Sequence, residues 1–282
     1  WGKCCIVGCS ALKIDMEAKT VSMGGKTYKE GDTLSLNGTK GTVYEGAVAT
    51  INASENELFK QFMQLVDKYR TMGVRTNADN PKDAQQAIDF GAEGIGLFRI
   101  EHMFYGENSE KPLAILRKMI LSGSTEERKH WLNELLPYIK VAVKGTMQVM
   151  NGKPVTFRLI DPPLHEFVPH TQENVEALAK ELGIAAEELN KRIVALEEVN
   201  PMMGLRGVRL GITYPEITET QFRALFEAEA ELRKEGFDPH LEIMVPLTIS
   251  VTELKHQKAI CDRVHAEVEA AMGAKIEYMY GT

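Results

Sequence analysis

We predict an α/β fold from this sequence, with a helix-covered parallel sheet as its main part, and three observations lead to that prediction. From residue 74 onward, short apolar runs typical of strands alternate with amphipathic stretches typical of helices. Residues 1–50 instead contain short β-prone runs separated by turn-forming pairs. The length of 282 residues suits one domain and part of another. We therefore expect a small β-rich unit followed by a larger α/β unit.

The first 50 residues predict a turn-rich β unit. Its β-prone runs are 4–7, 11–15, 20–23, 33–36 and 42–44, and its turn pairs are Gly24-Gly25, Glu30-Gly31 and Asn37-Gly38. The Asn-Gly pair is a strong hairpin signal, because a type I′ turn requires positive φ at both central residues.

Residues 51–73 predict a helix that connects the two units. Ser54 and Glu57 have the spacing of a capping box. The apolar residues that follow recur at helical spacing, and Gly73 is placed to end the helix.

Residues 74–282 predict an incomplete (β/α)₈ barrel of the TIM type. We expect strands at 74–77, 94–99, 155–160, 207–211, 241–246 and 275–280, and helices at 81–90, 113–121, 126–150, 175–182, 186–198, 219–234 and 252–272. A complete barrel has eight strands over about 250 residues, so about six of the eight are expected here. A doubly wound open sheet is the competing architecture, although no glycine-rich fingerprint follows the first strand.

Composition disfavours several classes of protein. The formal net charge is −7 with both signs interleaved, whereas a nucleic-acid interface needs a basic face. No apolar run approaches the roughly 20 residues of a membrane span, and no signal peptide is visible. The four cysteines match neither a zinc ribbon nor a thioredoxin-type motif, so we expect reduced thiols and a cytoplasmic protein.

Arg99 and Arg158 are the first candidates for a binding site. Each ends an apolar expected strand, and functional groups of a parallel barrel lie at the carboxyl ends of its strands. Two guanidinium forks from neighbouring strands would form a clamp for phosphate or carboxylate oxygens. The alternative is that each arginine pairs with a structural carboxylate, Glu101 or Asp161.

Other polar residues follow the same strands. Asp161 precedes two prolines that stiffen its loop, and it is suited either to orienting an arginine, which we favour, or to binding hydrated Mg²⁺. His102 and His165 are candidate acid–base groups, because imidazole suits that chemistry, but no nucleophile or metal-ligand spacing accompanies them, so we expect supporting roles. Arg206 and Arg209 accompany the fourth expected strand.

Four segments carry a resemblance to a known family. They are GIGLFRIEHMF (94–104), RLIDPPLHEF (158–167), NPMMGLRGVRLG (200–211) and EIMVP (242–246). In this order they resemble the pyruvate, phosphate dikinase family, and WGKCCIVGCS at the start is similar to the stretch after that family's phosphohistidine. The family's relatives, phosphoenolpyruvate synthase and enzyme I of the sugar phosphotransferase system, stay as alternatives, although the segment 161–167 favours the dikinase. Ile100 departs from the pattern, where threonine is expected.

The resemblance implies an α/β barrel (74–282) that binds phosphoenolpyruvate or pyruvate, after a linker helix (51–73) and the carboxyl-terminal part of a swivelling phosphohistidine domain (1–50). The implied reaction is the Mg²⁺-dependent conversion of ATP, pyruvate and phosphate to AMP, phosphoenolpyruvate and diphosphate. Arg99 and Arg158 match the family's phosphoenolpyruvate-binding arginines, and Asp161 and Arg206 match neighbouring active-site positions.

The resemblance also implies that the chain is a fragment, inactive alone. The phosphohistidine, the metal-binding glutamate and the proton-donor cysteine would lie outside it, as would the domain that binds ATP and phosphate, and Cys261 does not match the cysteine's motif. We expect the parent to be a homodimer, and a non-catalytic module that binds phosphorylated ligands or a partner is the alternative from another class. Because a cut barrel has open edges, we expect self-association, with Ile243, Val245 and Met279 exposed.

Overall fold

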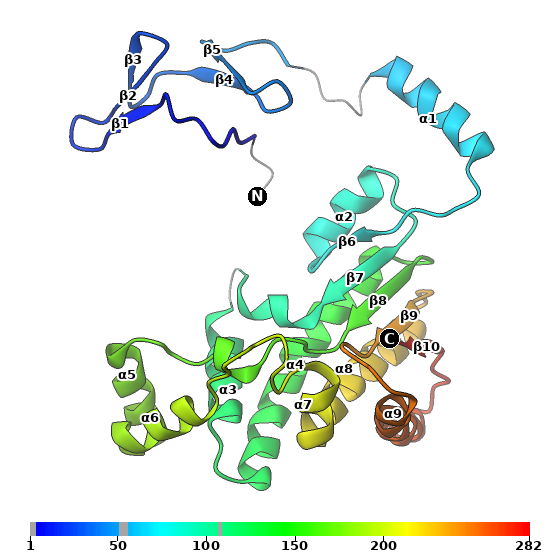
Figure 1. Ribbon diagram of the computed structural model, residues 1–282. Helices are drawn as coiled ribbons and strands as arrows, with labels where there is room; N and C mark the ends of the chain where they lie inside the picture. The colour runs from blue at the N-terminus through cyan, green and yellow to red at the C-terminus, as the bar shows by residue number, and fades with distance from the viewer. Residues whose placement is uncertain (1–3, 51–55, 107–108) are drawn as a thin grey trace. The chain divides into compact units, whose positions relative to one another are not determined.

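The computed structural model describes residues 4–50, 56–106 and 109–282. The chain divides into two compact units, one ending at Arg70 and the other beginning at Thr71 (Figure 1). No helix among the described residues is long and apolar enough to cross a membrane.

The first unit contains two small antiparallel sheets. Their strands are β1 (Lys13–Asp15), β2 (Thr20–Met23) and β3 (Lys26–Lys29) in one sheet, and β4 (Leu34–Asn37) and β5 (Thr42–Glu45) in the other. β3 was not expected, and the predicted strand at 4–7 is wrong, because these residues form no strand. The turn with positive φ at both central residues is Gly24-Gly25, at 56° and 78°. The hairpin at Asn37 is confirmed, but its loop is longer: Asn37 Oδ1 accepts the backbone N–H of Lys40 at 3.1 Å.

Helix α1 (Glu57–Tyr69) ends the first unit. Asn56 caps it, because its side chain accepts the backbone N–H groups of Leu58 at 3.0 Å and Phe59 at 3.4 Å. The predicted cap, Ser54, lies outside the described residues. The prediction that Gly73 ends this helix is wrong, because the helix ends at Tyr69, before a C-cap at Arg70 in extended conformation.

The second unit is built on a parallel sheet with strand order β6–β7–β8–β9–β10 (Figure 1). The strands are β6 (Thr76–Asn77), β7 (Ile95–Arg99), β8 (Pro154–Arg158), β9 (His240–Met244) and β10 (Tyr278–Gly281). The helices are α2 (Pro81–Asp89), α3 (Glu110–Ile120), α4 (Thr125–Val149), α5 (Gln172–Leu182), α6 (Ala186–Ala195), α7 (Gly207–Thr213), α8 (Pro215–Lys234) and α9 (Val251–Met272), with 3₁₀ turns at Ile100–Phe104 and Leu164–Glu166. The predicted alternation of strands and helices is therefore confirmed for five strands.

The fourth predicted strand, at 207–211, is wrong, because these residues form helix α7. Val208, Leu210 and Gly211 are all buried, which suits one face of a short helix as well as a strand. Gly211 permits close packing, since a Cβ there would lie 2.4 Å from Thr218 Oγ1 and 2.8 Å from Gln257 Oε1. The described residues thus contain five parallel strands of the expected sheet rather than six.

The two faces of this sheet differ in character. Along β8, Val155 and Phe157 are fully buried in the hydrophobic core, while Thr156 and Arg158 on the opposite face are partly exposed. β9 repeats this alternation. The expected exposure of Ile243 and Val245 is wrong, because both lie in the core at 2% and 1% exposure, whereas Met279 is exposed at 67%.

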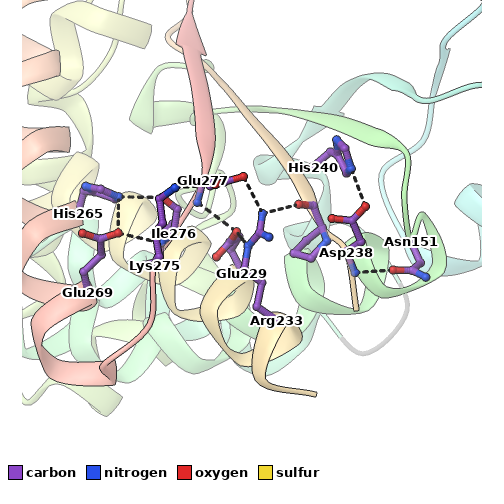
Figure 2. Close-up of polar contacts among 11 residues, drawn as sticks. Asn151, Glu229, Arg233, Asp238, His240, His265, Glu269, Lys275, Ile276 and Glu277 are labelled. Atoms are coloured by element: carbon purple, nitrogen blue, oxygen red, sulfur yellow. Dashed lines mark hydrogen bonds and ion pairs between the residues drawn. The ribbon is translucent and has the colours of Figure 1, made fainter. Parts of the chain in front are cut away.

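A polar network holds the amino-terminal ends of β9 and β10 (Figure 2). On α8, the buried carboxylate of Glu229 pairs with Arg233 and accepts the backbone N–H of Glu277 at 3.3 Å, just before β10. Arg233 also donates to the carbonyl of Pro239 at 3.3 Å, just before β9. The backbone N–H of Ile276 donates to a carboxylate on α9, at 2.8 Å. Side chains of two helices therefore fix where these strands begin.

Candidate anion-binding site

Arg99 and Arg158 lie side by side at the carboxyl edge of the sheet. Arg99 is the last residue of β7 and Arg158 the last of β8, and the two are register partners in the parallel pairing. Their side chains are partly buried, with 30% and 20% of their surface exposed. The sequence prediction that both arginines end neighbouring strands is confirmed.

The partner of Arg99 is Asp79, in the turn after β6. Asp79 Oδ1 accepts the backbone N–H of Arg99 at 2.7 Å and its Nε at 3.2 Å, and Oδ2 accepts Nη2 at 2.5 Å. His102 Nδ1 lies 3.0 Å from the same Oδ2. The hydrogen bond to Asp79 raises the pKa of Arg99, so the guanidinium stays charged. Neither carboxylate suggested by the sequence, Glu101 or Asp161, is therefore the partner of Arg99.

Arg158 is held by both carboxylates that the sequence suggested. Its Nη2 pairs with Glu101, and its Nη1 lies 3.0 Å from Asp161 Oδ2. The same Oδ2 also receives Arg206 Nη2 at 3.0 Å. Asp161 therefore joins two arginines that lie far apart in the sequence, which is the orienting role favoured for it.

This arrangement argues against Asp161 as a ligand of Mg²⁺. Its Oδ2 already lies 3.0 Å from two guanidinium groups, and a divalent cation there would be repelled by both. Among the described residues, no three His, Cys, Asp or Glu side chains are grouped so that they could hold a metal ion. The carboxylates of this site do not fit a metal centre.

Burial sets the electrostatics of the site. Glu101 is 2% exposed and Asp161 is 7% exposed. Burial raises the pKa of Glu101, although the charge of Arg158 opposes that shift. Glu101 Oε2, Asp161 Oδ1 and Arg158 Nε are buried without a hydrogen-bond partner among the residues that the structure describes. These three groups can therefore form further hydrogen bonds.

The segment before α7 positions Arg206 beside Asp161. Glu198 Oε1 accepts the backbone N–H of Leu205 at 2.8 Å. A Cβ at Gly204 would lie 2.4 Å from the Glu198 carboxylate, so a side chain there would displace the group that accepts the Leu205 N–H. Arg206 Nε also donates to the carbonyl of Asp161 at 3.3 Å. These contacts fix the loop that returns to the sheet after α6.

Two further predicted residues do not belong to the group formed by Arg99, Arg158 and Arg206. His165, in the 3₁₀ turn Leu164–Glu166, has a buried Nδ1 without a hydrogen-bond partner among the described side chains and backbone. Arg209 donates to the carbonyl of Met202 at 3.4 Å. Neither contacts Arg99 or Arg158 in a hydrogen bond that the structure records.

Three further polar side chains lie on the same face of the sheet as Arg158, nearer its amino-terminal edge. Glu242 Oε2 accepts Arg75 Nη1 and Thr156 Oγ1, each at 2.6 Å. These three side chains line an open cavity of about 240 Å³. This face is therefore polar, which the sequence had not indicated.

The chemistry of the cluster suits an anion. Each guanidinium is planar and donates along fixed directions, so it matches the oxygens of a carboxylate or a phosphate. Asp79 was not among the predicted site residues, although it lies just after β6 as Arg99 lies at the end of β7. The rule that identified the arginines could have identified it too.

Known proteins are similar to this chain over its whole length. The model of the PEP-utilising enzyme, PEP-binding domain, matches residues 53–282. The pyruvate, phosphate dikinase of Clostridium symbiosum is 46% identical over 282 residues, which are 100% of this chain and 32% of that protein. Those of Giardia intestinalis and of the Flaveria trinervia chloroplast are each 44% identical, over 100% of this chain and 31% and 30% of theirs. The chain thus spans about a third of the length of these relatives.

Proposed function

The chain belongs to the PEP-utilising enzymes, and we propose that it forms the phosphoenolpyruvate-binding part of a pyruvate, phosphate dikinase. The observation that carries the proposal is the register pairing of Arg99 with Arg158 at the carboxyl edge of the sheet. Phosphoenolpyruvate carries a phosphate and a carboxylate on the same carbon, and two adjacent guanidinium groups can engage both.

In this proposal the arginines bind and polarise the substrate. Phosphoryl transfer is promoted mainly by positioning and by positive charge directed at the transferred oxygens. Arg99 and Arg158 supply that charge, and Asp161, with Arg206, holds Arg158 in place. When pyruvate is the substrate, the same guanidinium groups stabilise the enolate and carboxylate oxygens.

The remaining chemistry belongs to the complete enzyme. We propose that residues 1–50 belong to the swivelling phosphohistidine domain, that residues 51–73 form the linker and that residues 74–282 belong to the (β/α)₈ barrel. Mg²⁺, ATP and phosphate would be bound by groups other than the carboxylates described above. Cys261 is unsuited to donating the enolate proton, because it is fully buried on α9 and burial raises its pKa to about 12.

We further propose that the complete enzyme acts in the cytoplasm as a homodimer. The chain itself should bind phosphoenolpyruvate but should not convert it to pyruvate and ATP, because it would lack the phosphate carrier. Some of its relatives are named as chloroplastic dikinases, and the names of others give no compartment.

Two measurements test this function. In calorimetric titrations the chain should bind phosphoenolpyruvate more tightly than inorganic phosphate, because phosphate lacks the carboxylate that the second arginine would bind. The complete gene product should form pyruvate and ATP from phosphoenolpyruvate, AMP and diphosphate in the presence of Mg²⁺. Equal affinity for the two ligands, with no turnover by the complete gene product, would favour the non-catalytic phosphate-binding module instead.

A further inference from the structure

The guanidinium of Arg99 is held along one edge only. Its Nε and Nη2 both donate to the carboxylate of Asp79, at 3.2 Å and 2.5 Å. The other usable edge, formed by Nη1 and the second N–H of Nη2, makes no hydrogen bond to the residues that the structure describes. A planar guanidinium has just these two edges for bidentate contacts. The edge that remains is therefore free for a second oxyanion.

Arg158 differs from Arg99 in this respect. Its two terminal nitrogens are each taken by a separate carboxylate, Glu101 and Asp161, and its Nε is buried without a partner. An incoming anion would have to share those nitrogens with the carboxylates. Of the two arginines, Arg99 is the one with an open bidentate edge.

Asp79 is itself fixed tightly enough to set the orientation of Arg99. Its carboxylate accepts the backbone N–H of Arg99 at 2.7 Å, in addition to the two guanidinium contacts. His102 Nδ1 lies 3.0 Å from Oδ2, and the side chain of Asp79 is 13% exposed. Because the backbone and the side chain of Arg99 bind the same carboxylate, rotation of the long side chain is restricted before any ligand arrives.

Resting on the function proposed above, we infer that Asp79 is a positioning residue for phosphoenolpyruvate binding. It holds Arg99 by one edge so that the opposite edge faces the substrate's oxygens. The expected change in phosphoenolpyruvate affinity is opposite in sign to the change that electrostatics alone would give. Removing a negative charge beside an anion site should tighten anion binding by Coulomb's law, whereas removing a positioning group should weaken it.

The test measures the dissociation constant of phosphoenolpyruvate by calorimetry, on the whole chain with Mg²⁺ in the buffer. We expect Asp79→Ala to weaken binding by about 10- to 100-fold, the usual consequence of misplacing a binding group. Asp79→Asn keeps one acceptor oxygen and should fall in between. Asp89→Asn is the matched control, because it removes the same charge from the exposed end of α2 without contacting Arg99. Thermal unfolding of each variant identifies those that are folded. If Asp79→Ala is not folded, Asp79→Asn takes its place in the binding measurement.

A double-mutant cycle separates positioning from a merely structural role. If Asp79 acts through Arg99, Asp79→Ala should cause no further loss of affinity in the Arg99→Ala background. The same fractional loss in both backgrounds would overturn the inference, and so would an Asp79→Ala variant that binds as tightly as the wild type or more tightly. Failure of the wild-type chain to bind phosphoenolpyruvate would instead overturn the proposed function, and the inference with it.

Discussion

Replacing Asp161 with alanine should destabilise the second unit measurably. The substitution removes one charge-assisted hydrogen bond from Arg158 and one from Arg206, both 3.0 Å long. Hydrogen bonds to charged groups contribute about 1.5–3 kcal/mol each, so the loss is about 3–6 kcal/mol. The substitution also removes the unpartnered buried Oδ1, which recovers about 1–3 kcal/mol. The midpoints of these two ranges leave a net destabilisation of about 2–3 kcal/mol.

Thermal unfolding followed by circular dichroism or calorimetry measures this effect. For a unit of this size each kcal/mol corresponds to roughly 2–4 °C, so the Tm of Asp161→Ala should fall by about 4–12 °C. Glu166→Ala is the control, because Glu166 is an exposed carboxylate in the same loop and the structure records no ion pair for it. If the two variants unfold at the same temperature, Asp161 does not hold the arginines as described.

Three further predictions concern activity, pH and association. In the complete gene product, Arg99→Ala or Arg158→Ala should slow the pyruvate half-reaction by about 10²–10³ and leave phosphorylation of the histidine by ATP intact; turnover near wild type would contradict the clamp. The hydrogen bond from Arg263 lowers the pKa of Glu219 from its ordinary value of 4.5, so its stabilisation is present above that pH and is lost as pH falls through the lowered value. The Tm difference between wild type and Glu219→Gln should accordingly be constant near pH 7 and vanish in acid; a difference that stays the same in acid would contradict this role of the ion pair. Because β6 and β10 are the edge strands of the sheet, light scattering should show concentration-dependent association of the chain; a monodisperse monomer at high concentration would refute this.

The regular elements of the second unit were predictable because their signals are local. Apolar runs bounded by polar residues located all five strands, and helical spacing located the long helices. The segment 207–211 could not be assigned by period alone, since a short buried run fits a strand or one helical face. Gly207 begins α7 with a φ of 54°, and that conformation has no sequence signal beyond glycine itself.

The sequence could predict the arginines of the site but not their carboxylate partners. Arg99 and Arg158 were identified because parallel strands bring their carboxyl ends together, a rule that needs no knowledge of partners. Which carboxylate pairs with which arginine depends on side-chain packing, and Asp79 reaches Arg99 from the preceding strand rather than from the same loop. Such contacts depend on tertiary geometry, and no periodic pattern in the sequence predicts them.

The network at the amino-terminal ends of β9 and β10 has a consequence for motion. Glu229, Arg233 and Glu277 fix the start of these strands in addition to the backbone hydrogen bonds of the sheet (Figure 2). The other end of these strands is the carboxyl edge of the sheet, where Arg99 and Arg158 end the neighbouring strands β7 and β8. We therefore expect local opening of β9 and β10 to begin at that edge rather than at their anchored origins. Ordering of that edge by a bound anion would therefore quench motion locally, while the strand origins change little.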